Sequence, residues 1–200
     1  SQRAGHSTPP KTCSELEADA HKLPITQGDS YKQLGCLPDY HGWETTTGHY
    51  FAQFSPTCFN KAGKSNLATD PAFEAGFKLQ KKLVDELGGF KKLETYRSGL
   101  GDEWGPKHPF HTGQVAMQLD GEWRLGMALA AKPKFDIGVA PLPVPDDQAG
   151  QYGKGYITGT ITGIAATSHK QNAAWEFVKY ITTNTDAVVN FSNAIHNVPS

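Results

Sequence analysis

The sequence predicts an α/β fold in which helices flank a mixed sheet. Helical patterns with clear start signals alternate along the chain with short stretches in which every second residue is apolar. Helices and strands that alternate in this way are typical of α/β domains. The 200 residues, of which 38% are hydrophobic and 20% charged, are enough for one ordinary domain or for two small lobes.

Two helices in the first half are predicted from their start signals. Thr12 and Glu15 form a capping-box pattern, and apolar residues then recur at helical spacing over 13–23. Asp70-Pro71 combines an N-cap residue with a proline at the first helical position. Apolar residues follow at helical spacing, and Gly88-Gly89 ends this helical pattern. Between these helices we expect a strand over 34–37 and a helix over 46–54, and after them a loop over 90–108.

Strand patterns dominate the second half. Apolar residues alternate over 115–119 and again over 135–139, with a helical pattern over 122–131 between them. The Gly- and Thr-rich stretch 150–166 predicts one or two further strands. Ser168 is expected to cap a last long helix, in which Trp175 belongs to the buried face.

Composition and short motifs exclude several classes of function. Nineteen basic and twenty acidic residues give a net charge of -1. The sequence has no basic stripe of the kind that binds nucleic acid, so we expect no nucleic-acid partner. Neither a phosphate-binding loop nor a nucleophile elbow is present, so we expect no cofactor. The cysteines Cys13, Cys36 and Cys58 fit no zinc pattern, and either a Cys36–Cys58 bridge or three isolated thiols is compatible with the sequence.

His108 and His111 lie three residues apart, a spacing that can share a metal ion on a helix. Pro109 disfavours a helix there, and no third ligand is evident. We therefore expect a solvated loop and no metal site.

Aromatic residues at strand ends are the best candidates for a binding site. One face of a pyranose carries C–H groups that pack on a flat ring, and its hydroxyls need a few fixed polar partners. Core packing is the alternative for each ring. The candidate ligand-binding residues are Trp123, Trp43, Glu122, Tyr156, His41 and Tyr40.

An enzymatic alternative rests on Asp120 and Glu122, which flank the end of the predicted strand beside Trp123. Glycosidases use two carboxylates on either side of the scissile bond. The sequence alone leaves this alternative open.

The motif Phe110–Met117 (FHTGQVAM), followed by Asp120-Gly121-Glu122-Trp123, resembles the family 1 extracellular solute-binding proteins of ABC transporters. The segments Pro9–Leu16, Phe135–Pro143, Ala173–Tyr180 and Asn197–Pro199 resemble further motifs of this family in the same order. The resemblance covers nearly the whole chain.

This resemblance implies a type II periplasmic-binding-protein-like fold, in which two α/β lobes close over a ligand. By this mapping residues 1–155 form the second lobe, and residues 156–200 form the crossover strand and helix that return to the first lobe. The first lobe is then largely missing and the family's C-terminal helices are absent, so we expect the chain to be a fragment.

The resemblance also implies a function. Family members of this type capture a carbohydrate outside the cytoplasm, in the periplasm or lipid-anchored at the cell surface, and deliver it to ABC transporter permease subunits. We therefore expect a monomeric binding protein and no enzymatic activity. Trp123 falls where relatives stack an aromatic ring on sugar, and Trp43 falls near another such region.

Overall fold

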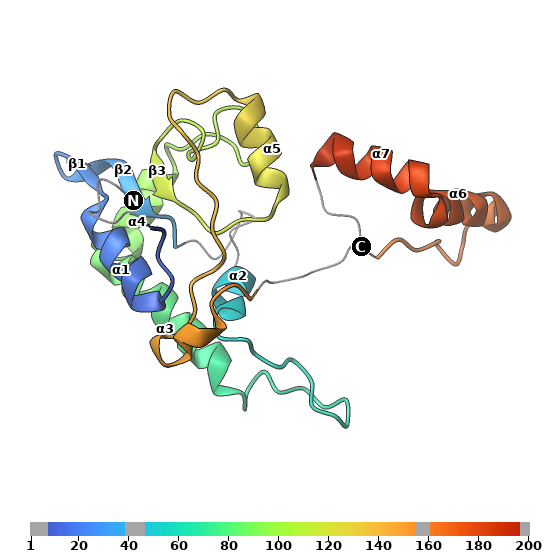
Figure 1. Cartoon of the computed structure of the whole chain (residues 1–200), viewed down its shortest axis with the longest axis horizontal. Coiled ribbons are helices and arrows are strands. Elements are labelled where there is room, and N and C mark those ends of the chain that lie inside the picture. Colours follow the sequence, from blue (N-terminus) through green and yellow to red (C-terminus); the bar gives the residue numbers. More distant parts are fainter. Residues whose placement is uncertain (1–7, 39–46, 155–160, 197–200) are drawn as a thin grey trace.

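The computed structural model describes residues 8–38, 47–154 and 161–196 (Figure 1). Within these ranges, no helix combines the length and apolar character needed to cross a membrane. The elements in chain order are α1 (Cys13–Lys22), β1 (Ile25–Gln27), β2 (Ser30–Cys36), α2 (Thr47–Ala52), α3 (Pro71–Glu86), α4 (Phe90–Arg97), β3 (Val115–Met117), α5 (Trp123–Ala130), the 3-10 helix η2 (Asp146–Gln151), α6 (Gln171–Thr183) and α7 (Thr185–Ile195).

The three described strands form a mixed sheet in the order β1-β2-β3. β1 and β2 are an antiparallel hairpin, whereas β2 and β3 run parallel, with Leu34 opposite Val115 and Cys36 opposite Met117. A parallel pair needs a long crossover, which α2, α3 and α4 supply here. The α/β prediction with a mixed sheet flanked by helices is confirmed.

Helices α1 and α3 begin where their caps predict. The Thr12 hydroxyl accepts the Glu15 amide at 3.4 Å, and the Glu15 carboxylate accepts the Lys11 amide at 2.7 Å. At α3, Asp70 accepts the Ala72 amide at 3.0 Å. Both caps satisfy backbone donors that the first helical turn leaves unpaired, which explains why the two starts could be read locally.

Two apolar clusters form the core, and β2 contributes to both. The first joins α1, α2 and α3 through side chains that include Leu16, Tyr50 and Leu83. The second joins the sheet to α3 and α4 and includes Leu34 and Leu93. Gly35 allows α1 to approach β2 closely, because a Cβ at this position would collide with the Ala20 carbonyl.

Three local predictions are wrong. Residues 90–97 are helix α4 rather than loop, because Leu93 and Tyr96 are buried against the second cluster. Residues 135–139 alternate in sequence but pair with no strand. The prediction of strands over 150–166 includes residues 155–160, which lie outside the described residues. The last helical segment is two helices, α6 and α7, and it begins at Gln171 rather than directly after Ser168.

The cysteines are free: Cys13 and Cys36 are buried, and Cys58 is exposed. No Cys36–Cys58 bridge forms. Burial raises the pKa of the Cys36 thiol to about 11 and that of Cys13 to about 12, with nearby Asp146 and Glu17 adding to the second shift. The buried thiols therefore behave as small apolar groups.

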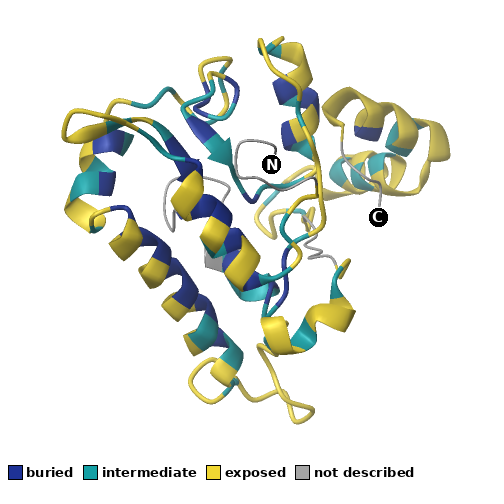
Figure 2. Ribbon diagram, turned by 60° about the vertical axis from the view of Figure 1, so that its left-hand side comes forward, coloured by how far each residue is buried: buried dark blue, intermediate teal, exposed yellow. Residues whose placement is uncertain are grey.

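Helices α6 and α7 pack on each other and stand apart from the sheet (Figure 1). Among the described residues of 161–196, only Ser192 is buried, and the pair is coloured almost wholly as exposed or intermediate in Figure 2. Trp175 is 56% exposed, so its predicted place in the core is wrong. Helix α6 carries an apolar face that the described residues leave largely exposed.

Candidate functional site

Trp123 opens α5 directly after the end of β3, at the predicted strand-to-helix junction. Its ring packs on Gly121, where a Cβ would collide with three ring carbons. The residue is half-buried, and its indole Nε1 is buried without a hydrogen-bond partner among the described residues. A flat ring fixed in this way is suited to packing against an apolar ligand face.

A buried ion pair underlies this junction. Arg124 Nε donates to Asp120 Oδ2 at 2.7 Å, and the two side chains are only 6% and 7% exposed. Asp120 also accepts the Gly121 amide at 2.8 Å and the side-chain amide of Gln118. Arg124 donates in addition to the Glu103 carbonyl at 2.9 Å. These bonds fix the backbone that carries Trp123.

His108 and His111 lie against this ion pair, with their ring centroids 4.9 Å apart. Both are buried, so the predicted solvated loop is wrong at these two residues. Burial first, then the Arg124 charge and His111, lowers the pKa of His108 to about 3. Burial and Arg124 also lower the pKa of His111. Neutral imidazoles can pack beside the guanidinium without adding charge to the cluster.

No group of three or more His, Cys, Asp or Glu side chains that could hold a metal ion occurs in the described ranges. The two histidines instead belong to the polar packing beneath the Trp123 junction. Their ring contact is thus a structural feature of the loop that precedes β3.

The predicted site residues divide into two groups. Trp123 and Glu122 adjoin at the start of α5, and Glu122 is exposed at the N-cap position. The other four predicted residues lie outside the described residues: Trp43, Tyr40, His41 and Tyr156.

Asp120 is poorly placed for catalysis. Its carboxylate accepts three donors and is almost fully covered, so a substrate could reach it only if the Arg124 pair were broken. The enzymatic alternative would then depend on Glu122 alone, whereas glycoside hydrolysis ordinarily needs two carboxylates.

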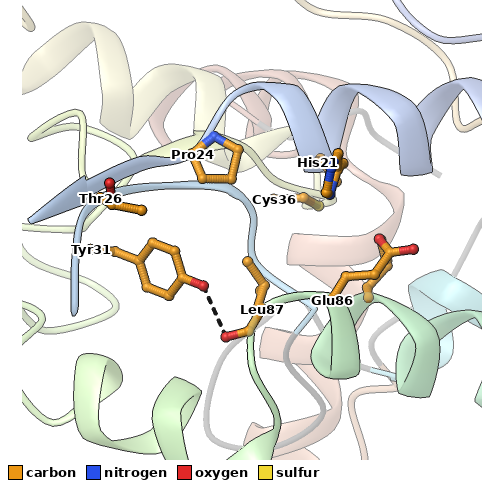
Figure 3. A pocket seen from close by; sticks show the side chains of 9 residues that line it. His21, Pro24, Thr26, Tyr31, Cys36, Glu86 and Leu87 are labelled. Atoms are coloured by element: carbon orange, nitrogen blue, oxygen red, sulfur yellow. Dashed lines mark hydrogen bonds between the residues drawn. The ribbon is translucent and has the colours of Figure 1, made fainter. Parts of the chain in front are cut away.

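Two hollows elsewhere do not include the candidate residues. A cavity of about 170 Å³ lies between α1, the β1–β2 hairpin and the end of α3 (Figure 3). Its wall is largely apolar, and the Tyr31 hydroxyl there already donates to the Leu87 carbonyl at 2.9 Å. A wider groove of about 510 Å³ runs between α1, α3 and the start of η2. Neither is lined by Trp123 or Glu122.

Sequence reasoning placed Arg124 beside Trp123 but missed its buried pairing with Asp120, which organises the site. The available signal was its position four residues after Asp120, a spacing at which opposite charges commonly pair. Burial of that pair depends on the distant loop 103–111, which no local pattern reveals.

The sequence signature described as "Bacterial extracellular solute-binding protein" matches residues 3–188. A protein named only as a binding protein from Brucella abortus (strain 2308) is 27% identical over 184 residues, which are 90% of this chain and 41% of the relative. The maltotriose-binding protein of Pyrococcus abyssi (strain GE5 / Orsay) is 28% identical over 111 residues, 55% of this chain and 24% of that protein.

Solved structures share the fold. CpMnBP1 with mannobiose bound superposes with a TM-score of 0.73 at 22% identity, over 99% of this chain and 49% of that one. The maltose/maltodextrin-binding domain MalE from Bdellovibrio bacteriovorus, bound to maltotriose, gives a TM-score of 0.66 at 21% identity, over 98% and 49% of the two chains. The chain thus spans at most about half the length of the relatives it matches.

Proposed function

The chain belongs to the family of bacterial extracellular solute-binding proteins, which are binding proteins and not enzymes, and from this premise we propose that its solute is a carbohydrate. The observation that carries the proposal is the half-buried indole of Trp123, seated on Gly121 above a buried ion pair. The names of several relatives support it, since they refer to maltotriose or mannobiose.

The chemistry of the junction suits a sugar. A pyranose presents C–H groups on one face, which can pack on the accessible part of the Trp123 ring. Its hydroxyls need donors and acceptors at the edge of that ring, and the exposed Glu122 carboxylate is the nearest residue along the chain that offers an acceptor. Trp43, Tyr40, His41 and Tyr156 are further contacts in this proposal.

We further propose that residues 1–155 form one lobe and that residues 156–200 begin the return to the other. The boundary between them falls within residues 155–160, which lie outside the described ranges. Support comes from α6 and α7, where Trp175, Phe177 and Phe191 are all more than half exposed. Helices with such a face are stable when another surface covers it.

In the whole protein, the proposed role is capture of the carbohydrate outside the cytoplasm, in the periplasm or at the cell surface. Delivery to the permease subunits of an ABC transporter would follow, with the binding protein acting as a monomer. Closure of two lobes over the sugar would bury it and raise its affinity.

Isothermal titration calorimetry against a panel of mono- and oligosaccharides tests the proposal. We expect binding by the native chain and at least a tenfold loss, about 1.4 kcal/mol, in Trp123→Ala. Trp175→Ala removes an equally large ring from α6 and should leave the affinity unchanged. If no saccharide binds, or if Trp123→Ala binds as the native chain does, the proposal is wrong.

A chromatographic assay for sugar products in the same samples addresses the enzymatic alternative. We expect the saccharides to be recovered intact. Product that forms with the native chain and disappears in Glu122→Gln would replace binding with hydrolysis as the function.

A further inference from the structure

Residues 57–69 form a narrow loop that projects from the body of the molecule, ahead of α3 and apart from α6 and α7 (Figure 1). Its two arms are joined by an isolated bridge between Phe59 and Ser65 and by a 2.8 Å hydrogen bond from the Asn66 amide to the Cys58 carbonyl. Every residue of the loop except Asn66 is exposed. The loop therefore keeps its shape through its own hydrogen bonds rather than through the core.

Asn60 closes the tip of this loop. Its side-chain oxygen accepts the amides of Ala62 at 2.9 Å and Lys64 at 3.0 Å, and its own amide donates to the Lys64 carbonyl at 2.9 Å. Gly63 completes the turn with a φ of 73°, a conformation that glycine adopts at low cost, and donates to the Asn60 carbonyl at 2.9 Å. A turn fixed in this way loses little conformational entropy when it meets a partner.

Two large apolar side chains on this loop face solvent. Phe59 is 64% exposed and Leu67 is 61% exposed. The turn at the tip uses asparagine and glycine, so its geometry requires neither of these side chains. One exposed apolar residue on a surface needs no explanation, but two on a short projecting loop are a candidate contact surface.

The loop is also basic. Lys61 and Lys64 are exposed at its tip, and residues 55–69 contain no aspartate or glutamate. The first acidic residues after the loop, Asp70 and Glu74, are at its base and already have partners. Asp70 accepts two backbone amides, and Glu74 pairs with a lysine of its own helix. The projecting end therefore presents positive charge without compensating negative charge.

We propose that this loop docks end-on to the surface of an anionic lipid membrane. Phe59 enters the lipid–water interface, while the ammonium groups of Lys61 and Lys64 stay among the anionic headgroups. A narrow projection suits this surface better than it suits a protein partner, because a stable protein interface buries about 800 Å² on each side. The membrane contact goes beyond the proposed solute and does not depend on it.

Cys58 provides a reporter on this loop in the native chain. Cys58 is exposed, whereas Cys13 and Cys36 are buried and their pKa values are raised by burial, so a thiol-reactive, environment-sensitive dye labels Cys58 at neutral pH. The labelled chain is titrated with vesicles of phosphatidylcholine mixed with phosphatidylglycerol, and with vesicles of phosphatidylcholine alone. We expect a saturable blue shift of the dye emission, with a partition coefficient about tenfold or more higher for the anionic vesicles.

Variants of the loop locate the contact. Lys61→Gln combined with Lys64→Gln should lower the partition into anionic vesicles about tenfold or more, and Phe59→Ser should lower it about tenfold. Lys22→Gln combined with Lys91→Gln is the matched control. It removes the same charge from exposed positions on α1 and α4 and should change the partition less than about twofold.

Several results would overturn the membrane contact. These are a dye emission that does not shift at the highest lipid concentration, and equal partition into neutral and anionic vesicles. An equal loss in the Lys22 and Lys91 double variant would also do so, because net charge rather than the loop would then drive binding. If pure lipid vesicles leave the chain in solution while bacterial membranes retain it until they are treated with a protease, the partner is a protein. Sugar binding is measured separately by calorimetry, so none of these results decides the proposed solute.

Discussion

Residues 8–154 and the helix pair α6–α7 reach their secondary structure by different means. The first region encloses two apolar clusters and a buried ion pair, so tertiary contacts hold its elements in place. The helix pair has good local signals, including the Asn184 side chain that accepts the Ala187 amide at 2.9 Å, yet it buries almost nothing among its described residues. Helical sequence alone does not create a core, and the second region depends on a covering surface.

The largest effect should come from the ion pair beneath Trp123. Arg124→Met leaves the Asp120 carboxylate buried without its cation, so we expect a loss of about 3–5 kcal/mol in the free energy of unfolding, measured in urea. Lys78→Met is the control, because Lys78 pairs with Glu74 on the exposed face of α3, where solvent screens the pair, and its removal should leave the free energy of unfolding nearly unchanged. A loss below about 1 kcal/mol in Arg124→Met would contradict the role given to the pair.

The apolar core should rank next. Leu34 is fully buried between the sheet and α3–α4, and Leu34→Ala should cost about 2–5 kcal/mol through lost burial and a cavity. Leu34→Met keeps the volume and should cost less than about 1.5 kcal/mol. Thermal unfolding compares the Tm of the two variants. Small and equal decreases in Tm would show that the second cluster is not tightly packed.

Acidification should destabilise the first region. The pKa of His108 is about 3 in the folded chain, against its ordinary value of 6.5. Between these two pH values the imidazole is protonated in the unfolded state but stays neutral in the folded state. Stability should therefore be highest above pH 6.5 and fall toward pH 3, by a few kcal/mol at most.

Urea unfolding at several pH values measures how steeply the free energy of unfolding changes with pH. His108→Asn keeps an acceptor for the Phe110 amide, which His108 Nδ1 accepts at 3.2 Å, but cannot titrate. The slope between pH 6.5 and pH 4.5 should flatten in this variant, and a slope equal to that of the native chain would assign the effect to other groups.

The smallest change is expected in the helix pair. Phe191→Ser in α7 replaces a 66% exposed ring, and the free energy of unfolding should shift by no more than about 0.5 kcal/mol. Solubility should rise, because an exposed apolar patch is reduced. A loss above about 1 kcal/mol would show that the face is covered in solution, and light scattering would tell whether a second copy covers it.

Elements whose position is set by neighbouring residues could be predicted from the sequence. The caps at Thr12 and Asp70 located α1 and α3, and the alternation from Val115 located β3. The failures involve distant contacts: α4 is helical because Leu93 and Tyr96 meet the second cluster, and residues 135–139 alternate without a partner strand. Trp175 has a core-like pattern, but the described part of the chain leaves it 56% exposed.

The candidate site follows the same division. Trp123 could be found because the strand end and Gly121 are adjacent in sequence. The hydrogen bond from Arg124 to the Glu103 carbonyl could not, because the two residues are 21 positions apart in the chain and only folding brings them together.

The most direct test of carbohydrate binding at this junction uses the four tryptophan indole N–H signals in a ¹H–¹⁵N NMR spectrum. Single Trp→Phe variants assign them, and an oligosaccharide such as mannobiose or maltotriose is then titrated into the labelled chain. The account predicts progressive, saturable shifts of the Trp123 signal while the Trp175 signal on α6 stays fixed. A Trp123 signal that does not move at saturation, or one that moves no more than Trp175, would contradict it.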